Sequence, residues 1–165
     1  MNEIQDLLNR YNASRQKPKK APYRKPQAVK ELECLYFSFY YKNRNTPQGL
    51  QIKKIFRDDT ANGLTECVCK WLELNGFFAA RINTTGTYNV KLKRFVFSGS
   101  KKGMADVTSV INGKHISIEI KIGNDRPRPE QLKVKTEIEK AGGNYIFVRN
   151  FDDFLTQIKN IINLK

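Results

Sequence analysis

Apolar residues recur at helical spacing through the first 60 residues of the chain. A short stripe over residues 4–11 predicts an amphipathic N-terminal helix. A longer stripe predicts a second helix that ends near the turn residues 45–49, and its members are Val29, Leu32, Leu35, Tyr36, Phe39 and Tyr40. Aromatic side chains at this spacing can stack on nucleic-acid bases, but packing into a core is the commoner outcome. Core packing is therefore the favoured interpretation.

From about residue 60 the pattern predicts helices and strands in alternation. A helix over residues 64–72 is closed by Asn75-Gly76, a common C-terminal cap pair. The later elements are strands over 77–83, 88–98, 104–111 and 114–122, a helix that opens at Pro129, a strand over 144–148 and a last helix from Asp152 or Asp153. The order α-β-β-β-β-α-β-α predicts an α/β sandwich over residues 61–165. Residues 1–60 are expected to form a basic helical extension.

Residues 104–122 carry the most specific local signal in the chain. Asn112-Gly113 between two alternating apolar runs predicts a two-residue β-hairpin. In that register Ile111 pairs with Lys114, and Asp106 lies directly opposite Glu119 on the same face. Lys121 is two residues beyond Glu119, so its side chain is expected on that face as well.

The other face of this hairpin is apolar enough to hold the register. Its members are Val107, Ile111, Ile116, Ile118, Ile120 and Ile122, and a slip by one residue would expose them all. Two carboxylates that face each other across a strand pair repel. They could be unrelated surface residues with Lys121 as a salt-bridge partner, but a Mg²⁺ ion needs such a pair with room for water. The pattern indicates a metal site in which a nearby ammonium stabilises the charge that develops on a phosphoryl group.

The charge of the chain points to a polyanionic partner. Its 165 residues include 30 Lys and Arg against 16 Asp and Glu, for a net charge of +14. Residues 1–60 carry 13 basic and 6 acidic side chains, and residues 61–165 carry 17 and 10, so each part is +7. We therefore expect both the Pro/Lys-rich linker over residues 15–26 and the folded body to meet nucleic acid. Ribosomal-type or merely solubilising charge is the alternative that composition leaves open.

The cysteines and the histidine argue against a zinc site. Cys34, Cys67 and Cys69 form an odd set without a C-x-x-C pair, and the single His115 does not complete one at a usual spacing. Reduced thiols are typical of a cytosolic protein. No apolar run approaches membrane-spanning length, and residues 1–10 lack a signal-peptide pattern. We therefore expect a cytoplasmic protein with no membrane partner.

Two ordered motifs resemble a known family. Residues 103–106 (GMAD) followed by residues 118–121 (IEIK) resemble the PD-(D/E)xK nuclease superfamily, and more narrowly the VRR nuclease domain in its small stand-alone form, common in bacteriophages. The resemblance covers about residues 65–154 and includes Thr65-Glu66, residues 98–102, residues 128–131 and residues 141–143. One departure is Ala105, where the superfamily's name has proline. The resemblance implies a restriction-endonuclease-like core, a central mixed β-sheet flanked by helices, in a bacterial or phage-infected host cell.

The same resemblance implies the roles of the site residues. Asp106, Glu119 and the carbonyl of Ile120 would hold Mg²⁺ or Mn²⁺. Lys121 would position or activate the attacking water, or stabilise the pentavalent phosphorus. Glu66 matches the helix acid that reaches the metal, often through water, although it could equally be a capping or exposed side chain. Gln131 matches a helix glutamine near the site.

Several basic residues flank the motifs and predict a phosphate-binding rim: Lys91, Lys93, Arg94, Lys101, Lys102, Arg126 and Arg128. Residues 83–86 are either a substrate loop or an ordinary turn. The chain is therefore predicted to be a metal-dependent DNA endonuclease, and the resemblance suggests structure-selective cutting of branched or junction DNA. A non-catalytic nucleic-acid-binding module on a nuclease fold is the main alternative. A packaging protein would explain the charge but not the Asp106–Glu119 pair, and a homodimer is left open.

Overall fold

The computed structural model describes residues 5–6, 22–42, 44–82, 87–96 and 101–163. Most of the predicted helix over residues 4–11 and of the linker over residues 15–26 lies outside the described residues, as does the loop 83–86. Within the described part of the chain, no helix is both long and apolar enough to cross a membrane. The three cysteines are free, and burial raises the pKa of the Cys67 thiol to about 12.

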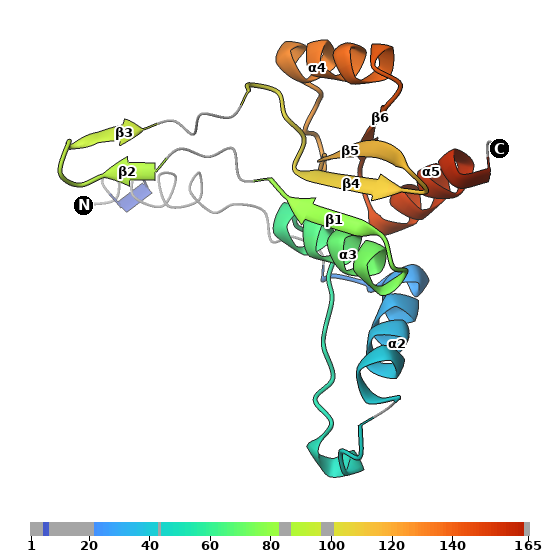
Figure 1. Ribbon diagram of the computed structural model, residues 1–165. Helices are drawn as coiled ribbons and strands as arrows, with labels where there is room; N and C mark the ends of the chain where they lie inside the picture. Colours follow the sequence, from blue (N-terminus) through green and yellow to red (C-terminus); the bar gives the residue numbers. More distant parts are fainter. Residues whose placement is uncertain (1–4, 7–21, 43, 83–86, 97–100, 164–165) are drawn as a thin grey trace.

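A mixed four-stranded sheet forms the centre of the protein, in the order β1-β4-β5-β6 (Figure 1). Its strands are β1 (Phe78–Arg81), β4 (Val107–Ile111), β5 (Lys114–Ile120) and β6 (Asn144–Val148). β4 is antiparallel to both β1 and β5, whereas β5 and β6 are parallel. The parallel pair needs a crossover connection, which α4 (Pro129–Lys140) supplies. The predicted α/β architecture is confirmed.

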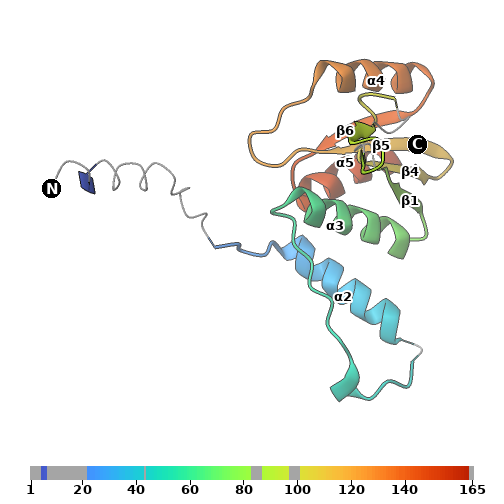
Figure 2. The ribbon, with the colours of Figure 1, turned by 90° about the vertical axis from the view of Figure 1, so that its left-hand side faces the viewer.

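Helices cover both faces of this sheet (Figures 1 and 2). On one face the apolar residues of β4 and β5 pack with α3 (Ala61–Leu74), α5 (Phe151–Asn163) and α2 (Gln27–Tyr41) in the main core. On the other face α4 packs through Val134 and Ile138 against Ala105 and Tyr145 in a smaller cluster. The sheet is thus the middle layer, and α2 lies beyond α3 on the side away from α4.

Residues on the N-terminal side of position 60 belong to the main core. Ala28, Val29 and Leu32 of α2 and Phe56 of the following extended segment are buried in the same cluster as the sheet. Asp58 ties this segment to α5, because its buried carboxylate accepts hydrogen bonds from the Phe151 amide at 3.1 Å and the Tyr23 hydroxyl at 2.8 Å. The predicted boundary at residue 60 therefore does not separate two cores.

The single strand predicted over residues 88–98 is wrong. The structure has two short strands there, β2 (Thr87–Asn89) and β3 (Arg94–Val96), which pair with each other in a separate two-stranded sheet. The turn between them is set by the Asn89 side chain, which accepts a hydrogen bond from the Leu92 amide, and by Lys93, which takes a positive φ of 47°. Residues 90–93 contain no glycine or proline, so the sequence did not indicate a turn there.

The second predicted helix is confirmed as α2, but its core packing is confirmed only in its first half. Val29 and Leu32 are buried, whereas Leu35, Phe39 and Tyr40 are exposed. The helix extends beyond the part of α3 that it packs against, so its C-terminal turns have no neighbouring layer (Figure 1). A shared helical stripe shows which residues lie on one face, but it does not show how far that face is covered.

Asp58→Ala should lower the free energy of unfolding by about 2 kcal/mol, because a helix cap and a buried hydroxyl lose their acceptor together. Asp59→Ala is the matched control, since Asp59 forms a more exposed ion pair with Arg57, and such pairs contribute at most about 1 kcal/mol. Urea unfolding of both variants and the wild type measures this difference. Equal losses would contradict the anchoring role of Asp58.

Candidate active site

The register of the β4–β5 hairpin places the two carboxylates as predicted. Val107 pairs with Ile118 and Ile111 with Lys114, and the turn residues Asn112 and Gly113 both have positive φ. One step before Val107, the Asp106 carboxylate Oδ2 accepts a hydrogen bond from the Ile120 amide at 2.9 Å. The Asp106 carbonyl accepts another from the Ile82 amide at 2.8 Å. Asp106 is therefore fixed between the chains of β1 and β5.

Glu119 is almost fully buried, with 5% of its surface exposed. Its Oε1 accepts a hydrogen bond from Gln131 Nε2 at 2.5 Å and lies 3.1 Å from Lys121 Nζ. Burial raises the pKa of the Glu119 carboxyl, and the nearby charge of Asp106 raises it further. Lys121 and Gln131 act in the opposite direction by stabilising the ionised form.

Lys121 is the most deeply buried charged group of the site, at 1% exposure. Its amide donates to the Val148 carbonyl at 2.8 Å, which continues the β5–β6 pairing by one residue. Its ammonium lies between two carboxylates, 3.1 Å from Glu119 Oε1 and 3.2 Å from Asp125 Oδ2. A buried ammonium is tolerated when it is paired in this way.

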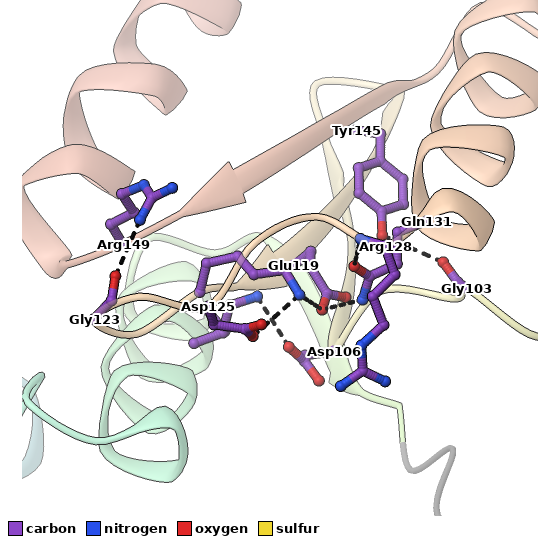
Figure 3. Close-up of polar contacts among 11 residues, drawn as sticks. Gly103, Asp106, Glu119, Gly123, Asp125, Arg128, Gln131, Tyr145 and Arg149 are labelled. Carbon is purple, nitrogen blue, oxygen red and sulfur yellow. Dashed lines mark hydrogen bonds and ion pairs between the residues drawn. The ribbon is translucent and has the colours of Figure 1, made fainter.

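Asp125 is a residue that the sequence interpretation missed. It follows a turn in which its amide donates to the Ile122 carbonyl and Gly123 takes a φ of 60°. This turn brings the Asp125 carboxylate back to Lys121, as Figure 3 shows for the side chains gathered at the ends of the strands. The glycine and asparagine at positions 123 and 124 are a turn signal that could have found it.

Gln131 is held by the start of α4. Its Oε1 accepts a hydrogen bond from the Arg128 amide at 2.9 Å, as the third residue of a helix does in a capping box. This leaves the Nε2 amide to donate to Glu119, so the cap also sets the direction of the side chain. The prediction that Gln131 lies near the carboxylates is confirmed.

Gly103 and Tyr145 hold the segment that precedes Asp106. Gly103 has a φ of 86°, and a Cβ at this position would lie 2.4 Å from the Glu130 carbonyl oxygen in α4. The Tyr145 hydroxyl donates to the Gly103 carbonyl at 3.3 Å. Burial raises the pKa of this hydroxyl, as do the charges of Glu119 and Asp106. The sequence showed this tyrosine only as part of a buried strand.

Glu66 is not brought to the carboxylate pair. It lies on the exposed side of α3, where its carboxylate is 2.6 Å from Lys54 Nζ, at an open pocket that Asn62 and Arg81 also line. Among the residues that the structure describes, no three His, Cys, Asp or Glu side chains are grouped closely enough to hold a metal ion. The metal role of Glu66 stays a prediction.

The remaining donors still fit a hard cation. Mg²⁺ is commonly bound by one or two carboxylates, with waters and substrate phosphate oxygens completing its shell. Asp106 and Glu119 supply such a pair, and the Glu119 contacts described above use only its Oε1. Ile120 lies between Glu119 and Lys121 at the end of β5, with its side chain in the main core. The role of its carbonyl is a prediction.

The basic residues predicted to form a phosphate-binding rim lie on the surface, on several different elements. Arg94 lies on β3 and Lys91 and Lys93 in the turn before it, all exposed. Lys101 forms an ion pair with Glu137 of α4. Three more of them are exposed: Lys102, which precedes Gly103, and Arg126 and Arg128, which come just before α4.

Comparison with protein-family models, with curated proteins and with solved structures finds no match to the chain.

Gly103→Ala should lower the free energy of unfolding by about 1–3 kcal/mol more than Gly123→Ala. Both glycines have a positive φ, so both substitutions carry the same kind of backbone strain, but an added Cβ meets the α4 backbone only at Gly103. Thermal melting of the two variants gives the difference. Equal destabilisation would show that the loop and the start of α4 are not tightly packed.

Asp106→Asn should lower the pKa of Glu119, measured by carboxyl carbon NMR in EDTA. A raised folded-state pKa means that unfolding free energy is lost as the pH rises from the unfolded value of about 4.3 through the folded value. The variant has less of this loss, so at pH 7 without metal it should melt at or above the wild-type temperature. The advantage should disappear below about pH 4, where Glu119 is protonated in the wild type and in the variant. Asp152→Asn, an exposed carboxylate in α5, is the control, and an unchanged Glu119 pKa in Asp106→Asn would contradict their proximity.

Proposed function

We propose that the chain is a Mg²⁺- or Mn²⁺-dependent endonuclease that hydrolyses phosphodiester bonds of DNA. The observation that carries this is the convergence of Asp106, Glu119 and Lys121 at the ends of β4 and β5, with the ammonium buried between carboxylates. A merely structural lysine would be more stable at the surface, because burying a charge is costly even when it is paired. The net charge of +14 supports a polyanionic substrate.

Each residue has a task that its contacts suggest. A divalent cation bound by Asp106 and Glu119 would polarise a phosphoryl oxygen and make a bound water more acidic. The Lys121 ammonium is placed to stabilise the negative charge that accumulates on the phosphoryl oxygens. Gln131 keeps Glu119 pointed at this position, and Gly103 keeps the approach to Asp106 in place.

The resemblance to the VRR nuclease domain supports the same proposal and adds finer statements to it. These are a restriction-endonuclease-like arrangement of the core and selective cutting at branched or junction DNA. The mixed sheet with β5 and β6 parallel and a helix between them is compatible with that arrangement. The exposed cations Lys102, Arg126 and Arg128 are proposed to contact the phosphate backbone.

Cleavage should require Mg²⁺ or Mn²⁺, stop in EDTA and fail in Ca²⁺, which is larger and prefers more ligands. The assay incubates the purified chain with linear duplex, single strand, flap and four-way junction DNA, beside Asp106→Asn. The variant should be inactive on all substrates. Wild-type activity in EDTA, or an active Asp106→Asn, would exclude this mechanism. DNA binding without cleavage of any substrate would instead favour a non-catalytic DNA-binding module.

Lys121→Ala should slow cleavage by about 100-fold or more, the usual effect of removing one charge-stabilising group. Binding of uncut DNA in EDTA should change by only a few fold, because many other cations contact the backbone. Lys121→Arg should restore little activity, since a planar guanidinium does not replace a compact ammonium. Lys140→Ala, on the exposed end of α4, is the control; turnover in Lys121→Ala equal to that control would remove Lys121 from the mechanism.

A further inference from the structure

The second half of α2 and the chain that follows it form a projecting arm, defined here as residues 35–42 and 44–55 (Figure 1). It contains the last turns of α2, the short helix η1 (Gln48–Leu50) and an extended segment. The Tyr41 hydroxyl joins the two sides, because it accepts a hydrogen bond from the Ile52 amide at 3.0 Å and donates to the Ile52 carbonyl at 3.3 Å. The two sides of the arm are therefore held together by hydrogen bonds within the arm itself.

Large apolar side chains are exposed along this arm. They are Leu35, Phe39, Tyr40, Leu50, Ile52 and Ile55, with Phe39 64% and Ile52 79% exposed. Single exposed apolar residues are ordinary, but several gathered on one projecting element mark a binding surface. None of these side chains is used by the proposed active site.

Aromatic rings contact one another in series from the core to the arm. Tyr36 packs edge-on against buried Phe56, with ring centroids 5.6 Å apart, and stacks on Tyr40 at 4.4 Å. The Arg44 guanidinium lies 5.4 Å from the Tyr40 ring centroid. These contacts hold the Tyr40 ring in place, so little side-chain freedom remains to be lost when another flat group stacks beside it.

The charged residues of the same segment are all positive. Between Glu33 and Asp58 the chain has five basic residues and no Asp or Glu. Lys42, Arg44 and Lys53 are exposed, while Lys54 and Arg57 already pair with Glu66 and Asp59. A second copy of the chain would bring the same positive charge to this surface and be repelled. A polyanion would be attracted.

We propose that the arm binds single-stranded nucleic acid, with bases stacked on Phe39 and Tyr40 and phosphates contacted by Lys42, Arg44 and Lys53. Exposed aromatic rings interleaved with cations are the arrangement that non-specific single-strand binding uses. A paired duplex does not offer its base faces, so the rings favour single strands over duplex. The arm lies beyond α3 from the sheet, so it is a second contact with nucleic acid, separate from the carboxylates (Figures 1 and 2). It rests on the proposed function only in sharing the same class of ligand.

The test measures binding of fluorescent dT20, rU20 and a 20-base-pair duplex to the full chain in EDTA, by anisotropy. EDTA removes the divalent cations that the proposed cleavage requires, so the result does not depend on nuclease activity. Phe39→Ala should weaken dT20 binding by at least about fivefold, the lower range for loss of one base–aromatic stack. Duplex binding should change less than twofold. Comparison of rU20 with dT20 shows whether the single strand that binds is DNA, RNA or both.

Phe78→Ala is the matched control, because Phe78 is a similarly exposed phenylalanine on β1, outside the arm. It should leave dT20 binding within twofold of the wild type. Lys42→Gln combined with Lys53→Gln should reduce the salt slope of dT20 binding by about 1.4, or about 0.7 per phosphate contact. Lys159→Gln, an exposed lysine of α5, should not.

Unchanged dT20 affinity in Phe39→Ala would overturn the proposal. So would a Phe39→Ala variant that turns a dimer into a monomer in sedimentation, because the surface would then be a protein interface. Binding of anionic phosphatidylserine vesicles that depends on Phe39, with no such dependence for either single strand, would also overturn it. If the arm variants lose single-strand binding while the wild type never cleaves in Mg²⁺, the arm proposal stands and the nuclease proposal fails.

Discussion

A slip of β5 by one residue against β4 would turn Ile118 toward α4 and bring Glu119 and Lys121 into the main core. The Asn112-Gly113 turn and the apolar face of the hairpin both oppose this slip. Because Glu119 and Lys121 alternate with buried Ile118 and Ile120, and Asp106 directly precedes buried Val107, the packing of the core and the placement of the chemistry are one constraint. Every other contact of the site depends on this pairing of β4 with β5.

The second layer of the site offsets the cost of holding like charges together. Burial and the charge of Asp106 both raise the pKa of Glu119, so the ionised pair needs support. Lys121 supplies a positive charge and Gln131 a hydrogen bond, each to the same carboxylate oxygen. Gln131 in turn depends on the first turn of α4, which packs against Gly103 just before Asp106. The segment before β4 and the helix after β5 thus meet around one carboxylate.

The parts of the fold that local chemistry determines could be predicted from the sequence. The hairpin followed from two turn residues, and α4 from Pro129 at its start and glycines after its end. Asp125 was missed although Gly123-Asn124 signals a turn before it, because its contact with Lys121 depends on how that turn folds back in space. Glu66 was expected near the metal from resemblance alone, whereas in the structure it pairs with Lys54, which lies in an extended segment without a pattern of its own. The exposed end of α2 shows the same limit, since periodicity reports a face and not its neighbour.

The central claim is that Asp106 and Glu119 together form a divalent-cation site. Calorimetric titration of Mn²⁺ into the wild type, Asp106→Asn and Glu66→Gln tests it most directly, without requiring a substrate. The structure predicts one site in the wild type, loss of at least about tenfold in affinity in Asp106→Asn, and wild-type binding in Glu66→Gln, whose side chain pairs with Lys54. Equal Mn²⁺ affinity in the wild type and Asp106→Asn would contradict the claim.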